Sequence, residues 1–274
     1  LAAISNDPMG ELNPNITLNI NAKGTVEFAK LCKAAGVKKF LMSSSCSIYG
    51  KSAKIDMVET DNTDPLTTYA KSKIHVEEHL YNLGSGDFCV SFLRNSTAYG
   101  DSPNLRIDLV VNNFLACAVA RNELRIMSDG TPWRPIVHVR DVCSAFIAGL
   151  EAPASIVSGR AFNVGVSNGN FTVRDIAEAA QNAVPGSELI FTGEHTDPRT
   201  YRVSFDRILS ELKGYYAPEW SLDLGGKELV NFFDRIGFTE DQFRGRETIR
   251  LKQLKHLYKN DFLDPSFRVI NIIN

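Results

Sequence analysis

The sequence lacks an excess of charge of either sign and lacks any long apolar run. Its 30 Lys and Arg residues nearly balance 32 Asp and Glu residues, which leaves a formal net charge of −2 at pH 7. This balance gives no electrostatic reason to expect nucleic acid or an anionic membrane as a partner. No run of about 18 apolar residues is present, so no transmembrane helix is expected, and no signal peptide is visible.

Cysteine is scarce and scattered, with no CxxC pair and no Cys/His cluster. The five cysteines are Cys32, Cys46, Cys89, Cys117 and Cys143. Neither a disulfide framework nor structural zinc is expected, and reduced thiols in a cytoplasmic protein are the default interpretation. The glycosylation pattern at Asn95-Ser-Thr97 is interpreted as coincidence, because no secretory signal accompanies it.

The first half alternates helical and β-rich stretches. The whole chain has 274 residues, of which 43% are hydrophobic. This length and composition suit one large domain or two modest ones. Periodicity predicts helices over 16–35 and 69–83, with strands over 37–45 and 87–97. Alternation of this kind, with buried strands, predicts an α/β fold built on a doubly wound parallel sheet.

The second half has shorter strands. The predicted elements after residue 105 are helices over 106–122, 140–151 and 171–184, strands over 124–130, 134–139, 161–166, 186–191 and 201–205, and a charged helical remainder. Turn residues near 100–105 suggest a boundary between 1–104 and 105–274, with the two parts interleaved.

Tyr69 and Lys73 are four residues apart, so they share one face of a predicted helix. A nearby ammonium would lower the Tyr69 pKa from its reference value of about 10 and make the phenol a usable acid or base. Such pairs also arise by chance as solvated side chains. Ser45, however, ends a predicted strand, and ligands bind beyond the carboxyl ends of strands in open α/β sheets. Together the three residues predict a proton-handling site.

Several short motifs have the order and spacing of those in a known protein family. The motifs are LAAIS at 1–5, NAKGT at 21–25, SSSCSIYG at 43–50, YAKSK at 69–73, LRNSTAYG at 93–100, RPIVHVRDV at 134–142 and FNVG at 162–165. With these the chain resembles the extended short-chain dehydrogenase/reductases, specifically the NAD-dependent epimerase/dehydratase family that includes UDP-glucose 4-epimerase. The resemblance implies a Rossmann-like domain over 1–104 and a smaller, mainly substrate-binding α/β region over 105–274.

By this resemblance Tyr69 is the acid/base, Lys73 holds the nicotinamide ribose and tunes Tyr69, and Ser45 completes the catalytic group. The implied cofactor is NAD, with NADP not excluded, and the protein positions it. Further cofactor contacts are implied for four residues: Ala2, Ala3, Asn21 and Ser43. For Asn21, an ordinary helix-surface amide is the competing interpretation.

The resemblance also implies a nucleoside-diphosphate sugar as substrate. Arg134 matches an arginine that grips the diphosphate, which suits a guanidinium because it donates two hydrogen bonds at once. The other implied substrate contacts are Ser45, Thr97, Asn112 and Arg199. His138 and Asp141 are interpreted as structural residues.

Departures from the family narrow the expected chemistry. Cys46 and Ser47 stand where dehydratases of the family carry a carboxylate pair, so water elimination is disfavoured. Ser47 also replaces a reactive cysteine of the thiol-using epimerases, and Thr97 stands where epimerases commonly have Asn. The Gly-rich pyrophosphate-binding turn of the family, with roughly the first 65 residues of its layout, has no counterpart, so the chain is expected to be an N-terminally truncated fragment, inactive alone.

The function expected is that of a nucleotide-sugar 4-epimerase or a closely related oxidoreductase, transferring hydride to and from NAD. A 4-ketoreductase, a hydroxysteroid-type dehydrogenase and a non-catalytic cofactor-binding protein are the alternatives. A homodimer paired through helices 16–35 and 69–83 is implied by the family, and the cysteine pattern predicts a cytoplasmic protein. The sequence leaves open the sugar, the nucleotide and the choice between NAD and NADP.

Overall fold

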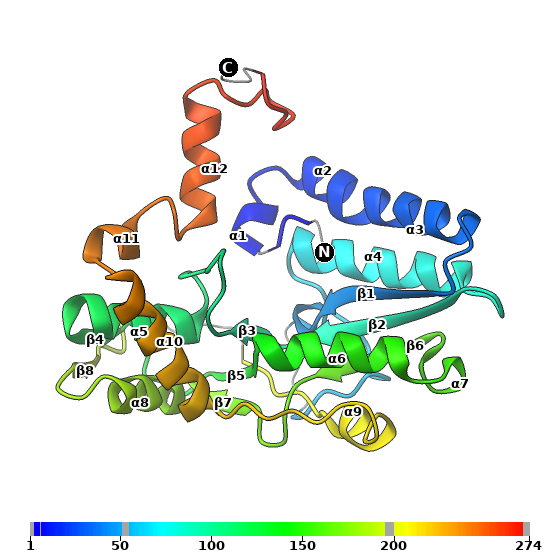
Figure 1. Cartoon of the computed structure of the whole chain (residues 1–274). Coiled ribbons are helices and arrows are strands. Elements are labelled where there is room, and N and C mark those ends of the chain that lie inside the picture. Colours follow the sequence, from blue (N-terminus) through cyan, green and yellow to red (C-terminus); the bar gives the residue numbers. More distant parts are fainter. Residues whose placement is uncertain (1–2, 6, 51–54, 195–199, 271–274) are drawn as a thin grey trace.

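A parallel three-stranded sheet forms the centre of the structure (Figure 1). The computed structural model describes residues 3–5, 7–50, 55–194 and 200–270. The sheet has the order β1-β2-β6, with β1 (Lys39–Ser45), β2 (Cys89–Asn95) and β6 (Arg160–Val164). Ser45 pairs with Asn95, and Asn95 pairs with Val164, so the carboxyl ends of all three strands meet at one edge. The predicted α/β fold with a parallel sheet is confirmed.

Helices cover both faces of this sheet. α3 (Thr25–Ala34) and α4 (Thr68–Leu83) lie on one face, and α6 (Val139–Glu151) lies on the other (Figure 1). The Thr67 side chain accepts a hydrogen bond from the Ala70 amide and so fixes the start of α4. α6 approaches β1 so closely that a Cβ atom on Gly149 would lie 2.4 Å from Leu41 Cδ2.

The second part of the chain adds two small sheets. One has the order β3-β5-β7, with β3 (Thr97–Tyr99), β5 (Trp133–His138) and β7 (Asn170–Thr172), and the other pairs β4 (Glu123–Ile126) with β8 (Glu188–Phe191). α5 (Val110–Arg121), α8 (Val173–Ala183) and α10 (Leu222–Ile236) share an apolar core beside them. Although α6 and β6 follow residue 104, they build on the first sheet, and the boundary at 104/105 stays a prediction.

Two expected elements differ from those observed. The helix expected over 16–35 consists of α2 (Pro14–Thr17), a π-helix (Leu18–Gly24) and α3. The strand expected over 201–205 is wrong, since Val203 makes only an isolated bridge to Met57. The side chain of Asn170 bonds both the amide and the carbonyl of Val203, and so takes the place of a neighbouring strand.

The remaining helices are short, apart from the last. They are α1 (Asp7–Gly10), a 3-10 turn (Cys46–Tyr49), α7 (Ala154–Val157), α9 (Asp206–Glu211), α11 (Glu240–Arg244) and α12 (Arg250–Lys259). α12 extends away from the body, with one end beside α1 (Figure 1). No described helix is both long and apolar enough to cross a membrane.

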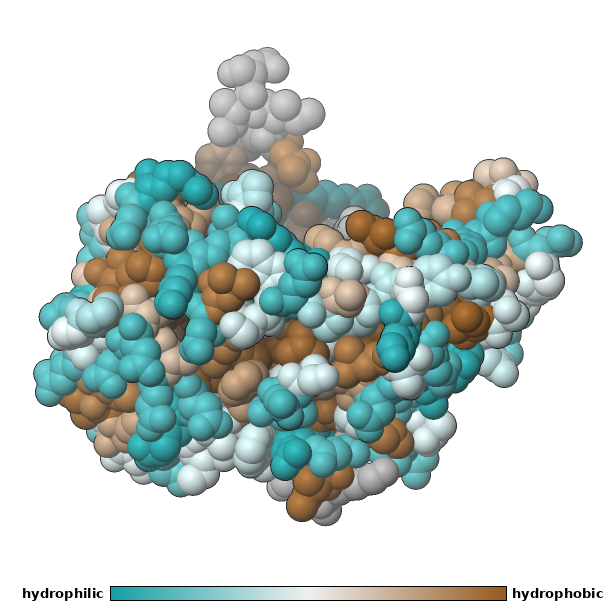
Figure 2. Space-filling view, turned by 60° about the horizontal axis from the view of Figure 1, so that its bottom comes forward, coloured by the Kyte–Doolittle hydropathy of each residue, from teal (hydrophilic) through white to brown (hydrophobic). Residues whose placement is uncertain are grey.

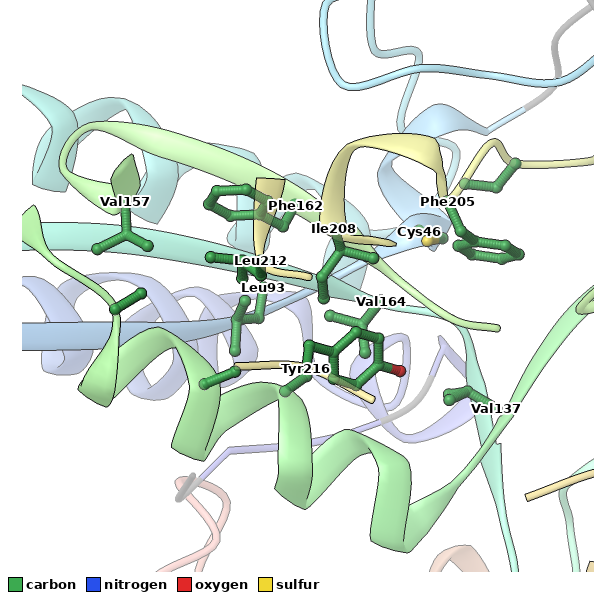
Figure 3. Packing of buried hydrophobic residues seen from close by; sticks show 14 of the residues in the cluster. Cys46, Leu93, Val137, Val157, Phe162, Val164, Phe205, Ile208, Leu212 and Tyr216 are labelled. Atoms are coloured by element: carbon green, nitrogen blue, oxygen red, sulfur yellow. The ribbon is translucent and has the colours of Figure 1, made fainter. Parts of the chain in front are cut away.

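The main core lies between the first sheet, α6 and α9 (Figure 3). Leu93 and Phe162 of the sheet, Ile208 and Leu212 from the α9 segment, and Tyr216 are all buried in it. Each such side chain contributes about 1.5–3 kcal/mol by leaving water. On the face in Figure 2, hydrophobic residues form separate patches between hydrophilic ones.

Candidate active site

The side chains of Ser45, Tyr69 and Lys73 meet at the carboxyl edge of the central sheet. Ser45 ends β1, while Tyr69 and Lys73 lie on the first turns of α4. The Ser45 hydroxyl lies near enough to the Tyr69 phenol to lower its pKa. Lys73 Nζ lies 5.4 Å from the centroid of the Tyr69 ring and donates a 2.7 Å hydrogen bond to the Ser43 carbonyl oxygen. The sequence therefore identified a group that the fold brings together.

The three consecutive serines have two different roles because side chains alternate along a strand. Ser43 and Ser45 are partly exposed on one face of β1. Ser44, only 2% exposed, points to the other face, where its hydroxyl donates to Glu77 Oε1. The Ser47 amide and hydroxyl both donate to Ser45 Oγ, at 3.2 and 2.9 Å, and orient it toward Tyr69.

The expectation of a lowered Tyr69 pKa is wrong for this structure. Burial is the largest effect and raises the pKa of Tyr69. The nearby Ser45 hydroxyl opposes this rise, Asp7 adds to it, and Arg106 lowers the pKa. Burial also lowers the pKa of Lys73 to about 8. Since desolvation penalises both the phenolate and the ammonium, the neutral phenol is the stable form at neutral pH.

An ion pair behind the site fixes α4 on the sheet. Arg94 Nη2 donates to Glu77 Oε2 at 2.7 Å, and both groups are largely buried. Arg94 Nη1 donates to the Tyr49 hydroxyl at 3.0 Å, which donates in turn to Asn163 Oδ1 at 2.6 Å. Glu77 is one helical turn beyond Lys73, so this network holds the face of α4 that carries Lys73 against β2.

Cys46 lies beside the site but is not poised as a nucleophile. Its thiol donates to the Arg94 carbonyl oxygen at 3.1 Å, and burial raises the pKa of Cys46 to about 12. A thiol of this kind stays protonated and unreactive at neutral pH. The observation agrees with the expectation that thiol-based epimerisation is not supported.

On the expected cofactor side, Asn21 holds the chain that precedes α1. Its Oδ1 accepts from the Ile4 amide at 2.8 Å, and its Nδ2 donates to the Ile4 carbonyl at 2.9 Å. Asn21 is 2% exposed and lies in the π-helix, a geometry frequent at functional sites. Asn21 is thus no helix-surface amide. Ala3 belongs to the segment it fixes, while Ala2 falls outside the described residues.

Three of the expected substrate residues lie on β3, β5 and α5. Thr97 begins β3 and pairs with Ile136 of β5. Arg134, also on β5, donates from Nη1 to the Trp133 carbonyl at 2.7 Å. Asn112 is buried and bonds the Gly100 amide and the Arg106 carbonyl, so in this structure it holds a loop. Arg199 falls outside the described residues.

His138 and Asp141 have structural contacts, as interpreted from the sequence. His138 Nδ1 accepts from the Arg140 amide at the start of α6, and its Nε2 lies 2.8 Å from Glu228 Oε2. The two carboxylate oxygens of Asp141 accept from the Glu219 and Trp220 amides. Both residues dock the chain before α10 on the start of α6.

A model of the NAD dependent epimerase/dehydratase family matches residues 1–165. The chain belongs to this family. It is 31% identical to the UDP-glucose 4-epimerase of Neisseria gonorrhoeae over 188 residues, which are 60% of this chain and 53% of that protein. It is 26% identical to UDP-glucuronic acid decarboxylase 1 of Arabidopsis thaliana over 242 residues, covering 85% of this chain and 54% of that protein. The chain thus spans about half the length of these curated relatives.

The fold of the family is also found in solved structures. The structure of MoeE5 in complex with UDP-glucuronic acid and NAD superposes with a TM-score of 0.74 at 24% identity, over 86% of this chain and 78% of that one. At this identity the likeness concerns the fold.

Asn95 is a further candidate site residue, which the sequence reasoning missed. Asn95 Nδ2 donates to Ser43 Oγ at 3.1 Å and to the Ser44 carbonyl at 3.3 Å, which fixes the orientation of the amide. Its Oδ1 is buried and has no hydrogen-bond partner among the described residues. A buried acceptor left unpaired costs about 1–3 kcal/mol, so the geometry fits a ligand with an N–H donor, such as the carboxamide of NAD. Its position at the end of a strand was the available signal.

Arg106 was also missed. It lies close enough to Tyr69 to lower the phenol pKa, although it is 37 residues further along the chain. Only the path of the loop between β3 and α5 brings it there, so no local pattern could have identified it.

Proposed function

We propose that the protein is a nucleotide-sugar 4-epimerase that works with NAD. The observation that carries the proposal is the grouping of Ser45, Tyr69 and Lys73 at the carboxyl edge of the parallel sheet in a member of the epimerase/dehydratase family. Relatives named UDP-glucose 4-epimerase, and a fold neighbour that binds UDP-glucuronic acid and NAD, support the choice of substrate and cofactor.

The protein's own residues would hold and move one proton. Tyr69 removes the proton of a sugar hydroxyl and later returns it, while Ser45 hydrogen-bonds the oxygen that becomes a carbonyl. When bound, NAD would supply the hydride acceptor and donor for the same carbon. Because burial raises the pKa of Tyr69, its phenol keeps its proton at neutral pH and can donate it to a sugar oxygen. To remove a proton from the sugar hydroxyl, Tyr69 needs a lower pKa, and the nearby Ser45 hydroxyl and Arg106 both lower it.

Other residues would bind the cofactor and substrate. Lys73, which donates to the Ser43 carbonyl, is the candidate for the nicotinamide ribose, and the unpaired Oδ1 of Asn95 supports a cofactor group nearby. Arg134 is the candidate for the diphosphate, which a guanidinium matches with paired donors. Thr97 and Asn112 remain proposed neighbours of the sugar.

The test is turnover of UDP-glucose and UDP-glucuronic acid by the protein in its natural length, with Tyr69→Phe as the variant. Removing an acid/base is expected to lower turnover about 10²–10⁴-fold while NAD binding is kept. Tyr81→Phe is the matched control, since Tyr81 lies on the same helix and is 63% exposed. Equal activity of Tyr69→Phe and the natural protein would refute the proposed role. Stoichiometric consumption of reduced cofactor would identify a reductase instead.

A homodimer through α3 and α4 belongs to the same proposal. α3 leaves the large side chains of Phe28 and Leu31 exposed, which supports a partner on this side. The mass in solution, measured by light scattering, tests it, and a monomer at micromolar concentration would contradict it.

A further inference from the structure

Two histidines stand one turn apart on α4. His75 and His79 are at i and i+4, so their side chains share one face of the helix. Their rings are stacked, with centroids 4.0 Å apart and planes inclined by 28°. His79 is exposed and His75 is partly exposed, so both rings are accessible to a ligand. Two imidazoles at this spacing are an arrangement with which helices bind zinc.

A backbone contact fixes which nitrogen of His79 is free. Its Nδ1 lies 2.8 Å from the His75 carbonyl oxygen. Because a carbonyl oxygen only accepts hydrogen bonds, Nδ1 carries the proton, and the lone pair of the neutral ring is on Nε2. Zinc-binding histidines are commonly oriented in this way, with the second ring nitrogen donating to a carbonyl oxygen. His79 therefore presents Nε2 as a metal ligand.

The pair supplies only half of a zinc site. Structural zinc is almost always bound by four ligands in tetrahedral positions. Among the side chains that the structure describes, no group of three or more His, Cys, Asp and Glu could hold a metal ion. A closed site on His75 and His79 therefore needs two further ligands from outside this chain.

Two contacts show how α4 lies against the helices before it. Asn21 Nδ2 in the π-helix donates to Ser72 Oγ at 3.4 Å, and Lys33 Nζ near the end of α3 donates to the Leu83 carbonyl oxygen at 2.7 Å. The π-helix and α3 together therefore run beside α4 in the same direction. Figure 1 shows α3 and α4 as neighbours on one face of the central sheet.

The histidine pair lies between these two contacts, in the middle of the face that α3 and α4 form. Ile20 and Leu31, near the two ends of this span, are 45% and 67% exposed. This is the face proposed above to pair two copies of the chain. In a two-fold dimer a surface patch meets the same patch of its partner, and bundles of four helices build metal sites from side chains on facing helices. A second histidine pair would supply the two missing ligands.

We propose that His75 and His79 from two copies of the chain together bind one zinc ion and link the copies through α4. The inference rests on the homodimer proposed above and is independent of the sugar chemistry. Such a site uses no cysteine, so the absence of Cys-rich zinc patterns from the sequence does not bear on it. Zinc that binds only the assembled pair would shift the equilibrium toward the dimer.

The experiment titrates zinc chloride into the natural-length protein, without a histidine tag, by calorimetry. One zinc ion per two chains is expected. His79→Gln and His75→Gln should each weaken zinc binding by at least the 10- to 100-fold that loss of an outer-shell contact costs. His256→Gln is the matched control, because no other histidine lies within one turn of His256, and it should bind zinc as the natural protein does.

Light scattering with zinc and with EDTA measures the second effect. Zinc should lower the protein concentration at which the natural protein dimerises, and should not do so in His79→Gln. Equal thermal midpoints of the variants and the natural protein without zinc would show that the fold is kept. One zinc ion per chain, or unchanged zinc binding in both α4 variants, would overturn the shared site. A dimer that does not bind zinc would overturn the site and leave the proposed dimer intact, whereas a monomer under all conditions would overturn both.

Discussion

Lys73 extends past the ring of Tyr69 and donates a 2.7 Å hydrogen bond to the backbone carbonyl oxygen of Ser43. Its ammonium is largely buried, with the nearest carboxylate influence coming from Glu77, and its pKa falls to about 8. The chain therefore maintains a charged group where charge is costly, a common property of functional sites.

Lys73→Met should stabilise the protein at neutral pH, because it removes a buried charge. The folded-state pKa of about 8 lies below the ordinary value of 10.5. Below pH 8 both states hold the proton and the full cost of burial is present. Between about pH 8 and 10.5 only the unfolded chain keeps the proton, so the stability of the natural protein rises with pH. The gain from Lys73→Met, on the order of 1–3 kcal/mol at pH 7, should therefore shrink toward pH 10.

Urea unfolding of both proteins at pH 7, 8, 9 and 10 measures this gain. Lys71→Met, which removes an exposed lysine of the same helix, is the control and should show no comparable change with pH. A gain that stays constant across this range would contradict the lowered pKa of Lys73.

Removing one partner of the ion pair between Arg94 and Glu77 should strongly lower the free energy of unfolding. Glu77→Gln leaves the buried guanidinium without its anion, and a loss of about 3–5 kcal/mol in the free energy of unfolding is expected. The double variant Glu77→Gln, Arg94→Met should lose less than the sum of the single variants, because no lone charge is left behind. The exposed pair of Arg121 and Glu240 gives the control, since Glu240→Gln should lower the free energy of unfolding far less than Glu77→Gln. Additive losses at Glu77 and Arg94 would show that the pair is not coupled.

The proximity of Ser45, Tyr69 and Lys73 could be anticipated from the sequence, whereas their electrostatics could not. The spacing of Tyr69 and Lys73 fixes a shared helix face, and Ser45 at a strand end fixes the edge of the sheet. The direction of the Tyr69 pKa depends instead on how deeply the phenol is buried, which only the packed structure reveals. The bond from Asn21 to Ile4 and the bond from Arg250 to Ser5 likewise arise from tertiary contacts, and the second joins residues 245 positions apart.

The cysteines should differ sharply in their reaction with iodoacetamide. Cys143 is exposed on α6, whereas Cys46 is buried, bonded to a backbone carbonyl and has its pKa raised to about 12. At pH 7.5 the folded protein should be alkylated at Cys143 and not at Cys46, because the thiolate is the reactive form. Peptide mass spectrometry after timed labelling checks this, and labelling in urea should reach both. Early labelling of Cys46 in the folded protein would reopen thiol chemistry at the site.

Asn95 offers the sharpest test of the cofactor side. Its Nδ2 is used twice within the sheet, so Asn95→Ala removes those bonds together with the unpaired Oδ1. Loss of two bonds would destabilise the protein, but loss of the unpaired acceptor offsets part of that cost, and a net change within about 1 kcal/mol is expected. If a ligand group donates to Oδ1, NAD binding should weaken about tenfold in Asn95→Ala, the value of one hydrogen bond.

Fluorescence titration with NADH measures the change in cofactor affinity, and urea unfolding measures the change in stability. Asn231→Ala, at an exposed asparagine of α10, should leave both unchanged. Unaltered NADH affinity in Asn95→Ala would mean that the acceptor serves no cofactor group.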